Sequence, residues 1–204
     1  MPCWFKAIPI IKGVEEMNKT NSALKKMAIT AMFAAMTTVL TYFVKIPTPG
    51  GYIHLGDSVI YLMACFLPTP YAMIGAGIGG SLADLFGGYF HYIIPTFIIK
   101  MLIAVPFSCK NEKMLTVRNA VMVVPAGMIT VAGYYVTKVV LLAIDKATAE
   151  LGFIGAFFDA STWAAALYKI PENTIQAVGS AIAFIIFALA FDGAKLKKRV
   201  LSIR

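Results

Sequence analysis

The chain has 204 residues, of which 59% are apolar and only 14% are charged, and its mean hydropathy is +0.78. Soluble domains carry about 45–50% apolar and about 25% charged residues, so this composition excludes an ordinary soluble enzyme. Because a membrane-spanning helix needs roughly 20 residues, six spans and their loops leave no room for a separate soluble domain.

Prolines, glycines and polar stretches divide the chain into six predicted membrane helices. These helices cover residues 23–44, 57–67, 71–86, 93–108, 117–142 and 173–191. Pro47 and Pro49 follow the first helix and stop it. We expect residues 1–22 to form a cytoplasmic or interfacial arm, 23–192 an all-α membrane domain, and 193–204 a basic cytoplasmic tail.

The distribution of basic residues predicts the topology. They gather before the first helix, in the loop between the fourth and fifth helices, and in the tail. They include Lys25, Lys26, Lys110, Lys113, Arg118, Lys195, Lys197, Lys198, Arg199 and Arg204. Basic loops face the cytoplasm, and only an even number of spans places all three groups on that side. We therefore expect a multi-pass protein of a bacterial or archaeal cell membrane with both termini in the cytoplasm, and no nucleic-acid partner.

Several chemistries lack their sequence signatures. Cys3, Cys65 and Cys109 show no metal-ligand spacing, so we expect no metal, disulfide or cofactor. A phosphate-binding loop for ATP hydrolysis is absent, and so is a zinc-protease motif. Residues 1–16 lack the long apolar region of a cleavable signal peptide. The sequence favours a protein that is not an enzyme, although His54 and His91 leave an intramembrane enzyme open.

Small residues recur at four-residue spacing on two predicted helices. Gly75 and Gly79 lie on the third, and Ala31 and Ala35 lie on the first. Such spacing lets helix backbones approach closely. The pattern predicts either packing within the chain or a docking face for another membrane protein.

Two ionisable residues within predicted spans are candidates for a substrate site, because charges in lipid are costly and often functional. Asp84 and Lys100 lie at similar depth in neighbouring helices. They can therefore form an ion pair that fixes the hairpin, or they can face a water-filled pocket. Asp57 either caps the second helix or contributes to the same site, and His54 lies three residues before it.

The remaining candidates come from the segments predicted to face outward. Asn173 and Gln176 begin the sixth helix, where they either cap it or bind substrate. Tyr89, His91 and Trp163 lie in outward loops. The aromatic residues there either form the interfacial belt of the membrane or, in the case of Tyr89 or Trp163, stack on a ligand.

Three motifs resemble those of a known family. Residues 46–57 read IPTPGGYIHLGD, residues 79–89 read GGSLADLFGGY, and residues 170–176 read IPENTIQ. Together they resemble the substrate-binding S components of energy-coupling factor (ECF) transporters, in the branch with a GGYIHLGD-type first outward loop.

This resemblance implies a six-helix bundle with a substrate pocket near its outer face. It implies that Ala31 and Ala35 contact a transmembrane coupling subunit, and that two ATPase subunits complete an ABC-type importer. The substrate would be a small water-soluble vitamin or precursor, with hydroxymethylpyrimidine or pyridoxine favoured and riboflavin as a further candidate. A self-sufficient channel or secondary transporter is the alternative, and an intramembrane enzyme is a third.

Overall fold

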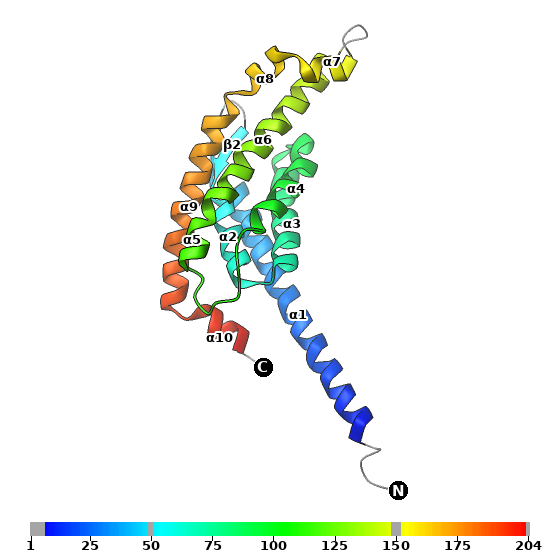
Figure 1. Cartoon of the computed structure of the whole chain (residues 1–204), viewed down its shortest axis with the longest axis vertical. Coiled ribbons are helices and arrows are strands. Elements are labelled where there is room, and N and C mark those ends of the chain that lie inside the picture. Colours follow the sequence, from blue (N-terminus) through cyan, green and yellow to red (C-terminus); the bar gives the residue numbers. More distant parts are fainter. Residues whose placement is uncertain (1–6, 49–50, 148–151, 203–204) are drawn as a thin grey trace.

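The computed structural model describes residues 7–48, 51–147 and 152–202, which are almost entirely helical. The helices are α1 (Ala7–Tyr42), α2 (Gly56–Phe66), α3 (Thr69–Gly87), the 3-10 helix η2 (Phe90–Tyr92), α4 (Ile93–Ala104), α5 (Val117–Val121), α6 (Val123–Lys146), α7 (Gly152–Phe158), α8 (Ala160–Ala166), α9 (Lys169–Gly193) and α10 (Leu196–Ser202). They form an elongated bundle with α7 and α8 at one end (Figure 1). The beginning of α1 and the C-terminal helix α10 lie toward the other end.

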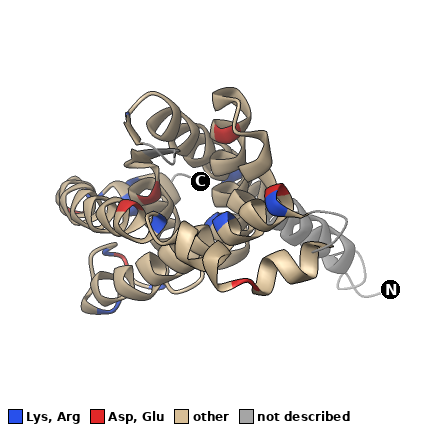
Figure 2. Cartoon of the chain, turned by 90° about the horizontal axis from the view of Figure 1, so that it is seen from above, with Lys and Arg blue, Asp and Glu red and all other residues tan. Residues whose placement is uncertain are grey.

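Three helical stretches are long and apolar enough to cross a membrane: Thr20–Tyr42, Val117–Lys146 and Ala160–Gly193. Two shorter apolar helical stretches, Gly56–Phe66 and Phe90–Ala104, lie between them. Charged residues occupy little of the ribbon in the view from above (Figure 2). The all-α membrane fold is thus confirmed, while the count of six spans stays a prediction.

Several helix boundaries differ from the predicted ones. Helix α1 begins at Ala7 instead of residue 23, because the polar stretch before residue 23 lacks a membrane pattern but contains good helix formers. Helix α4 ends at Ala104, ahead of Pro106. The predicted fifth helix is divided at Met122 into α5 and α6, since Pro125 has no N–H to continue the ladder.

The connection over residues 143–172 contains the two short helices α7 and α8, with residues 148–151 outside the described chain. The Asp159 side chain caps α8 by accepting a hydrogen bond from Ser161 N at 3.0 Å. Its carboxylate also pairs with Lys146 at the end of α6. This polar contact fastens α8 to α6.

A β-hairpin between α1 and α2 was not predicted. Strands β1 (Lys45–Thr48) and β2 (Gly51–His54) pair antiparallel, and Lys45 is opposite His54. The hairpin returns the chain to the bundle, where α2 follows at once. All eleven residues of α2 are buried, so this short helix runs through the interior, surrounded by longer helices.

Glycines allow α3 to pack closely between α1 and α4. A methyl group at Gly79 would lie 2.7 Å from Ala34 O on α1, and one at Gly80 would lie 2.7 Å from Lys100 Cγ on α4. Thr38 of α1 donates a hydrogen bond to Gly79 O at 2.9 Å. The small residues of α3 therefore serve packing within the chain, and they hold α4 in position for the site described below.

Polar contacts fasten the end of the bundle near α10. The buried Lys197 ammonium donates to the carbonyl oxygens of Cys65, Cys109 and Asn111 at 2.8, 2.6 and 2.6 Å. The Asp192 carboxylate accepts from the backbone N–H groups of Met114 and Leu115. Helix α10 is therefore joined to the C-terminal end of α2 and to the loop after α4.

Candidate functional site

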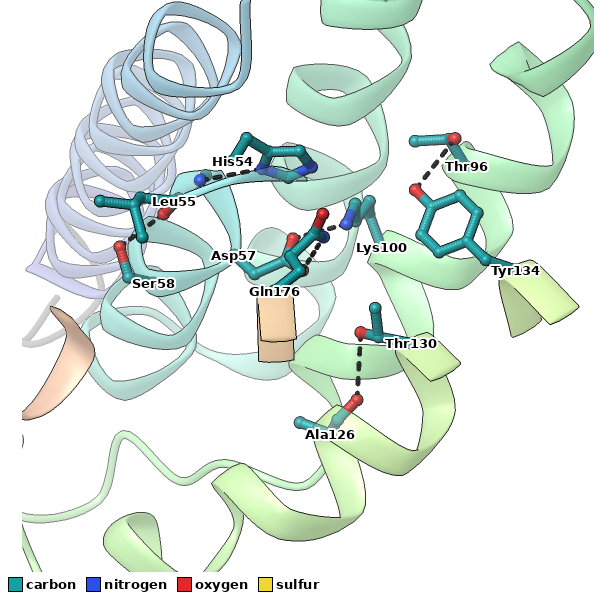
Figure 3. Close-up of polar contacts among 11 residues, drawn as sticks. His54, Leu55, Asp57, Ser58, Thr96, Lys100, Ala126, Thr130, Tyr134 and Gln176 are labelled. Carbon is teal, nitrogen blue, oxygen red and sulfur yellow. Dashed lines mark hydrogen bonds and ion pairs between the residues drawn. The ribbon is translucent and has the colours of Figure 1, made fainter. Parts of the chain in front are cut away.

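A buried ion pair lies at the centre of the bundle. Lys100 Nζ on α4 lies 2.5 Å from Asp57 Oδ1 on α2, and the two side chains are 1% and 0% exposed. Gln176 Nε2 on α9 donates to the other carboxylate oxygen, Asp57 Oδ2, at 3.0 Å. One carboxylate thus joins three helices that are far apart in the sequence (Figure 3).

The local sequence explains why these groups are inside. Asp57 occupies the first turn of α2, a helix that is buried on every side. Lys100 lies on the buried face of α4 together with Thr96, Ile99 and Ile103. Its aliphatic stem passes over Gly80 of α3, where any larger residue would collide with it. The glycine on α3 therefore makes the space in which the lysine reaches the aspartate.

His54, at the end of β2, lies beside this pair and is 5% exposed. Its Nδ1 accepts a hydrogen bond from Gly56 N at 3.0 Å, so this nitrogen carries no proton. Burial lowers the pKa of His54 to about 3, the Lys100 ammonium lowers it as well, and Asp57 offsets part of the effect. The imidazole is therefore neutral at physiological pH.

Aromatic and hydroxyl groups form a further side of the site. Tyr134 on α6 shares a 3.1 Å hydrogen bond with Thr96, and Lys100 Nζ lies 5.1 Å from the centre of the Tyr134 ring. The Tyr92 ring lies 6.3 Å from that of Tyr134. Asp84 is buried and acts electrostatically on both tyrosines. The site therefore combines charged, amide, imidazole and aromatic groups in the buried interior of the bundle.

Two interpretations of these residues are corrected. Lys100 forms its ion pair with Asp57 instead of Asp84, because α2 runs through the interior directly beside α4. Asp57 does not cap α2: the cap residue is Leu55, which makes no side-chain capping bond. The Asp57 carboxylate instead points into the bundle, where the lysine and the glutamine neutralise and bind it.

Two further predicted site residues, Asn173 and Trp163, lie on α9 and α8. Asn173 is buried on α9, one helical turn before Gln176, and its Nδ2 donates to Lys169 O at 2.8 Å. Trp163 belongs to a separate aromatic cluster with Tyr135 and Phe157, at ring distances of 5.7 and 5.5 Å.

The turn between α3 and α4 holds the last two candidates. Tyr89 is half-buried beside Gly87, and His91 is exposed. Within the described residues, the side-chain hydrogen bonds of Asp57 and Lys100 join these two residues to each other and to Gln176, and none goes to Tyr89, His91 or Trp163. The structure therefore gathers His54, Asp57, Lys100 and Gln176, with Asp84 and Asn173 near them.

Sequence reasoning missed three polar residues of this region. Tyr134 and Thr96 lie in apolar stretches and resemble ordinary membrane-helix residues. Lys169 precedes the predicted start of the sixth helix, but it is buried and forms a 3.1 Å ion pair with Glu172. The motif of a lysine three residues before a glutamate was the one available signal for it.

Ala31 and Ala35 lie on the outside of α1 and are exposed. With Ala34 they line an apolar groove of about 580 Å³ between α1 and α3, and Gly75 forms part of its other wall. The groove lies apart from the buried ion pair, and none of the residues that form that pair line it.

Within the described residues, no three His, Cys, Asp or Glu side chains gather as metal ligands would. No curated protein matches the chain. The family described as ECF-type riboflavin transporter, S component, matches residues 21–192. The chain belongs to this family. It is a multi-pass protein of a prokaryotic cell membrane and a vitamin-binding, substrate-capture subunit of an ECF transporter, and it is not an enzyme.

Proposed function

We propose that this S component captures a heteroaromatic vitamin through a pyrimidine-type edge, and that riboflavin is its substrate. The observation that carries the proposal is the Lys100–Asp57–Gln176 contact. Along it, the side chains offer a donor, an acceptor and a donor in turn. The pyrimidinedione edge of riboflavin offers the complement, a carbonyl oxygen, an N–H and a second carbonyl oxygen.

The surrounding groups support a flat, uncharged ring. Tyr134 and Tyr92 present aromatic surface beside the ion pair. The neutral His54 adds a polar group without net charge. The charges of Asp57 and Lys100 cancel each other, so a neutral ligand leaves the site electrically balanced. The family match also favours riboflavin.

Smaller vitamins remain competitors for the same groups. Hydroxymethylpyrimidine carries an amino group beside a ring nitrogen, which matches the Asp57 carboxylate and one donor. Pyridoxine offers hydroxyl groups around a pyridine ring. Both engage fewer of the three groups than the pyrimidinedione edge does, so we expect weaker binding.

Energy for import would come from partners. We propose that a transmembrane coupling subunit docks in the groove that Ala31 and Ala35 line, and that two ATPase subunits complete the transporter. The groove supports this proposal because small residues on α1 and α3 allow another helix to approach closely.

The first experiment is a thermal-shift and equilibrium-binding series on the purified chain. Riboflavin, hydroxymethylpyrimidine and pyridoxine are the ligands, and each is titrated to saturation. A ligand that binds the folded state raises Tm as its concentration exceeds Kd. We expect riboflavin to bind most tightly; tighter binding of either competitor would contradict the substrate assignment.

A second experiment tests whether the chain depends on partner subunits for transport or transports the vitamin by itself. The chain alone, reconstituted in liposomes, should bind riboflavin but not accumulate it. Accumulation should require the coupling subunit, the ATPases and ATP. Uptake by the chain alone at the same rate would instead favour a channel or secondary transporter.

A further inference from the structure

Two hydroxyl groups in the interior of the bundle make no hydrogen bond within the described residues. They are Tyr61 Oη on α2 and Ser180 Oγ on α9, and both residues are 0% exposed. A buried hydroxyl without a partner loses its bonds to water and gains nothing in return. Each such group therefore needs an explanation.

Their positions relate both hydroxyl groups to the ion pair. Tyr61 follows Asp57 by four residues on α2, and Ser180 follows Gln176 by four residues on α9. Residues four apart lie on the same helix face, one turn along. Helices α2 and α9 are in contact at two successive levels. Gln176 donates a hydrogen bond to Asp57, and one level farther along the Tyr61 ring lies 5.9 Å from the Phe184 ring. The two residues thus form the next layer beneath the Asp57–Gln176 contact.

The Tyr61 side chain lies on the face of α2 that carries Asp57. Side chains on a helix lean toward its N-terminus, which for α2 is the end that carries Asp57. Asp57 and Tyr61 interact electrostatically, so the hydroxyl lies within range of the carboxylate. The ring is fixed from below, because it stacks on Phe107 at 4.9 Å and meets Phe184 edge-on. The ring therefore has little freedom to turn.

The neighbouring helix α6 brings one hydroxyl close to Tyr61, that of Thr130. This hydroxyl donates to Ala126 O at 3.2 Å (Figure 3), so it can serve Tyr61 only as an acceptor. Phenylalanine and alanine would fill the same space without a buried hydroxyl group. Tyrosine and serine here cost the unliganded protein stability, which is expected of residues that serve a ligand.

We propose that Tyr61 and Ser180 are further substrate-binding residues that hydrogen-bond a polar substituent at the inner edge of the bound vitamin. Their site is the layer one helical turn beneath the donor–acceptor–donor contact of Lys100, Asp57 and Gln176, which would form the inner end of the proposed substrate pocket. Its ligand is a neutral hydroxyl or carbonyl group, since none of the described residues places a charged side chain in this layer. The inference rests on the proposed vitamin-capture function.

The test uses Tyr61→Phe and Ser180→Ala, which remove one hydroxyl each and keep most of the shape. Thr162→Val is the matched control: Thr162 Oγ1 is also buried without a hydrogen-bond partner, but it lies on α8 beside a separate cavity lined by Leu142 and Asp145. Each variant is purified as the full chain. Its Tm is measured without ligand, and its affinity is measured for riboflavin, hydroxymethylpyrimidine and pyridoxine.

We expect the two pocket variants to bind the preferred compound about tenfold more weakly or worse, from the loss of a buried hydrogen bond. Thr162→Val should keep wild-type affinity. Without ligand, all three variants should unfold at the wild-type temperature or above it, because each loses an unpaired hydroxyl. Unchanged affinity in both pocket variants would overturn the inference while leaving the proposed function intact.

The Tm measured without ligand gives a second test of the inference, which does not depend on knowing the substrate. A clear fall in Tm for Tyr61→Phe and Ser180→Ala, with none for Thr162→Val, would show that the hydroxyls stabilise the protein itself, directly or through bound water, and would overturn the inference. If wild type binds none of the three compounds, the proposed substrate fails. A raised Tm in both pocket variants would still support hydroxyls reserved for another ligand.

Discussion

Lys100 and Asp57 form an ion pair whose two side chains are almost completely removed from solvent. Removing two charges from water is expensive, and their attraction repays this cost only when the geometry and the remaining hydrogen bonds are good. Gln176 supplies one such bond to Asp57. A pair of this kind stabilises the fold only weakly. In the proposed function it supplies a fixed donor and acceptor for the vitamin.

Removing one charge of this pair should lower the free energy of unfolding far more than replacing both residues together. We expect Lys100→Met or Asp57→Asn to lower the free energy of unfolding by about 3–5 kcal/mol, because each leaves a buried charge without its partner. The double variant should recover most of that loss. Chemical unfolding in detergent measures all three, and a double variant as unstable as the sum of the singles would contradict this account. Riboflavin binding should be lost in every case.

Asp84 should contribute to affinity more than to folding if it faces the ligand. We expect Asp84→Asn to weaken vitamin binding by about 1–3 kcal/mol through the loss of a charge-assisted hydrogen bond. His91→Ala is the matched control, because His91 is exposed in the neighbouring turn. Isothermal titration measures both. Wild-type affinity together with a lowered Tm in Asp84→Asn would assign this residue a structural role.

The membrane class, the approximate helices and the polar candidates could be predicted because they depend on local composition. Prolines and glycines marked most helix ends to within a few residues. Asp57, Lys100 and Gln176 were identified because polar side chains are conspicuous in apolar helices. The partner of Lys100 could not be predicted, since it depends on which helix occupies the centre of the bundle.

The β-hairpin and the contacts of Tyr134 could not be predicted from the sequence either. Strands β1 and β2 are four residues long and contain a glycine and a proline, so local propensity does not reveal them. Tyr134 resembles any tyrosine of a membrane helix until α4 brings Thr96 and Lys100 beside it. Long-range packing, which a single sequence does not show, decides both features.

The α1–α3 groove should be necessary for assembly but not for binding. Ala31→Leu and Ala35→Leu fill a surface that lies apart from the ion pair, so they should block co-purification with the coupling subunit and leave vitamin affinity unchanged. Ala132→Leu is the matched control, because Ala132 lines an apolar groove between α6 and α9. Normal co-purification of both α1 variants would exclude this docking face.

His54 should make the fold sensitive to acid. Its pKa is about 3 in the folded chain and 6.5 in a model peptide, so between these values the unfolded chain binds more protons. Stability must therefore fall as the pH drops below about 6.5. The structural reason is that a protonated Nδ1 can no longer accept the Gly56 N–H.

His54→Asn keeps an acceptor near this position without a titrating ring. We expect wild-type Tm to fall between about pH 7 and pH 5 and the variant to show a flatter profile. Parallel profiles for the two proteins would assign the acid sensitivity to other groups.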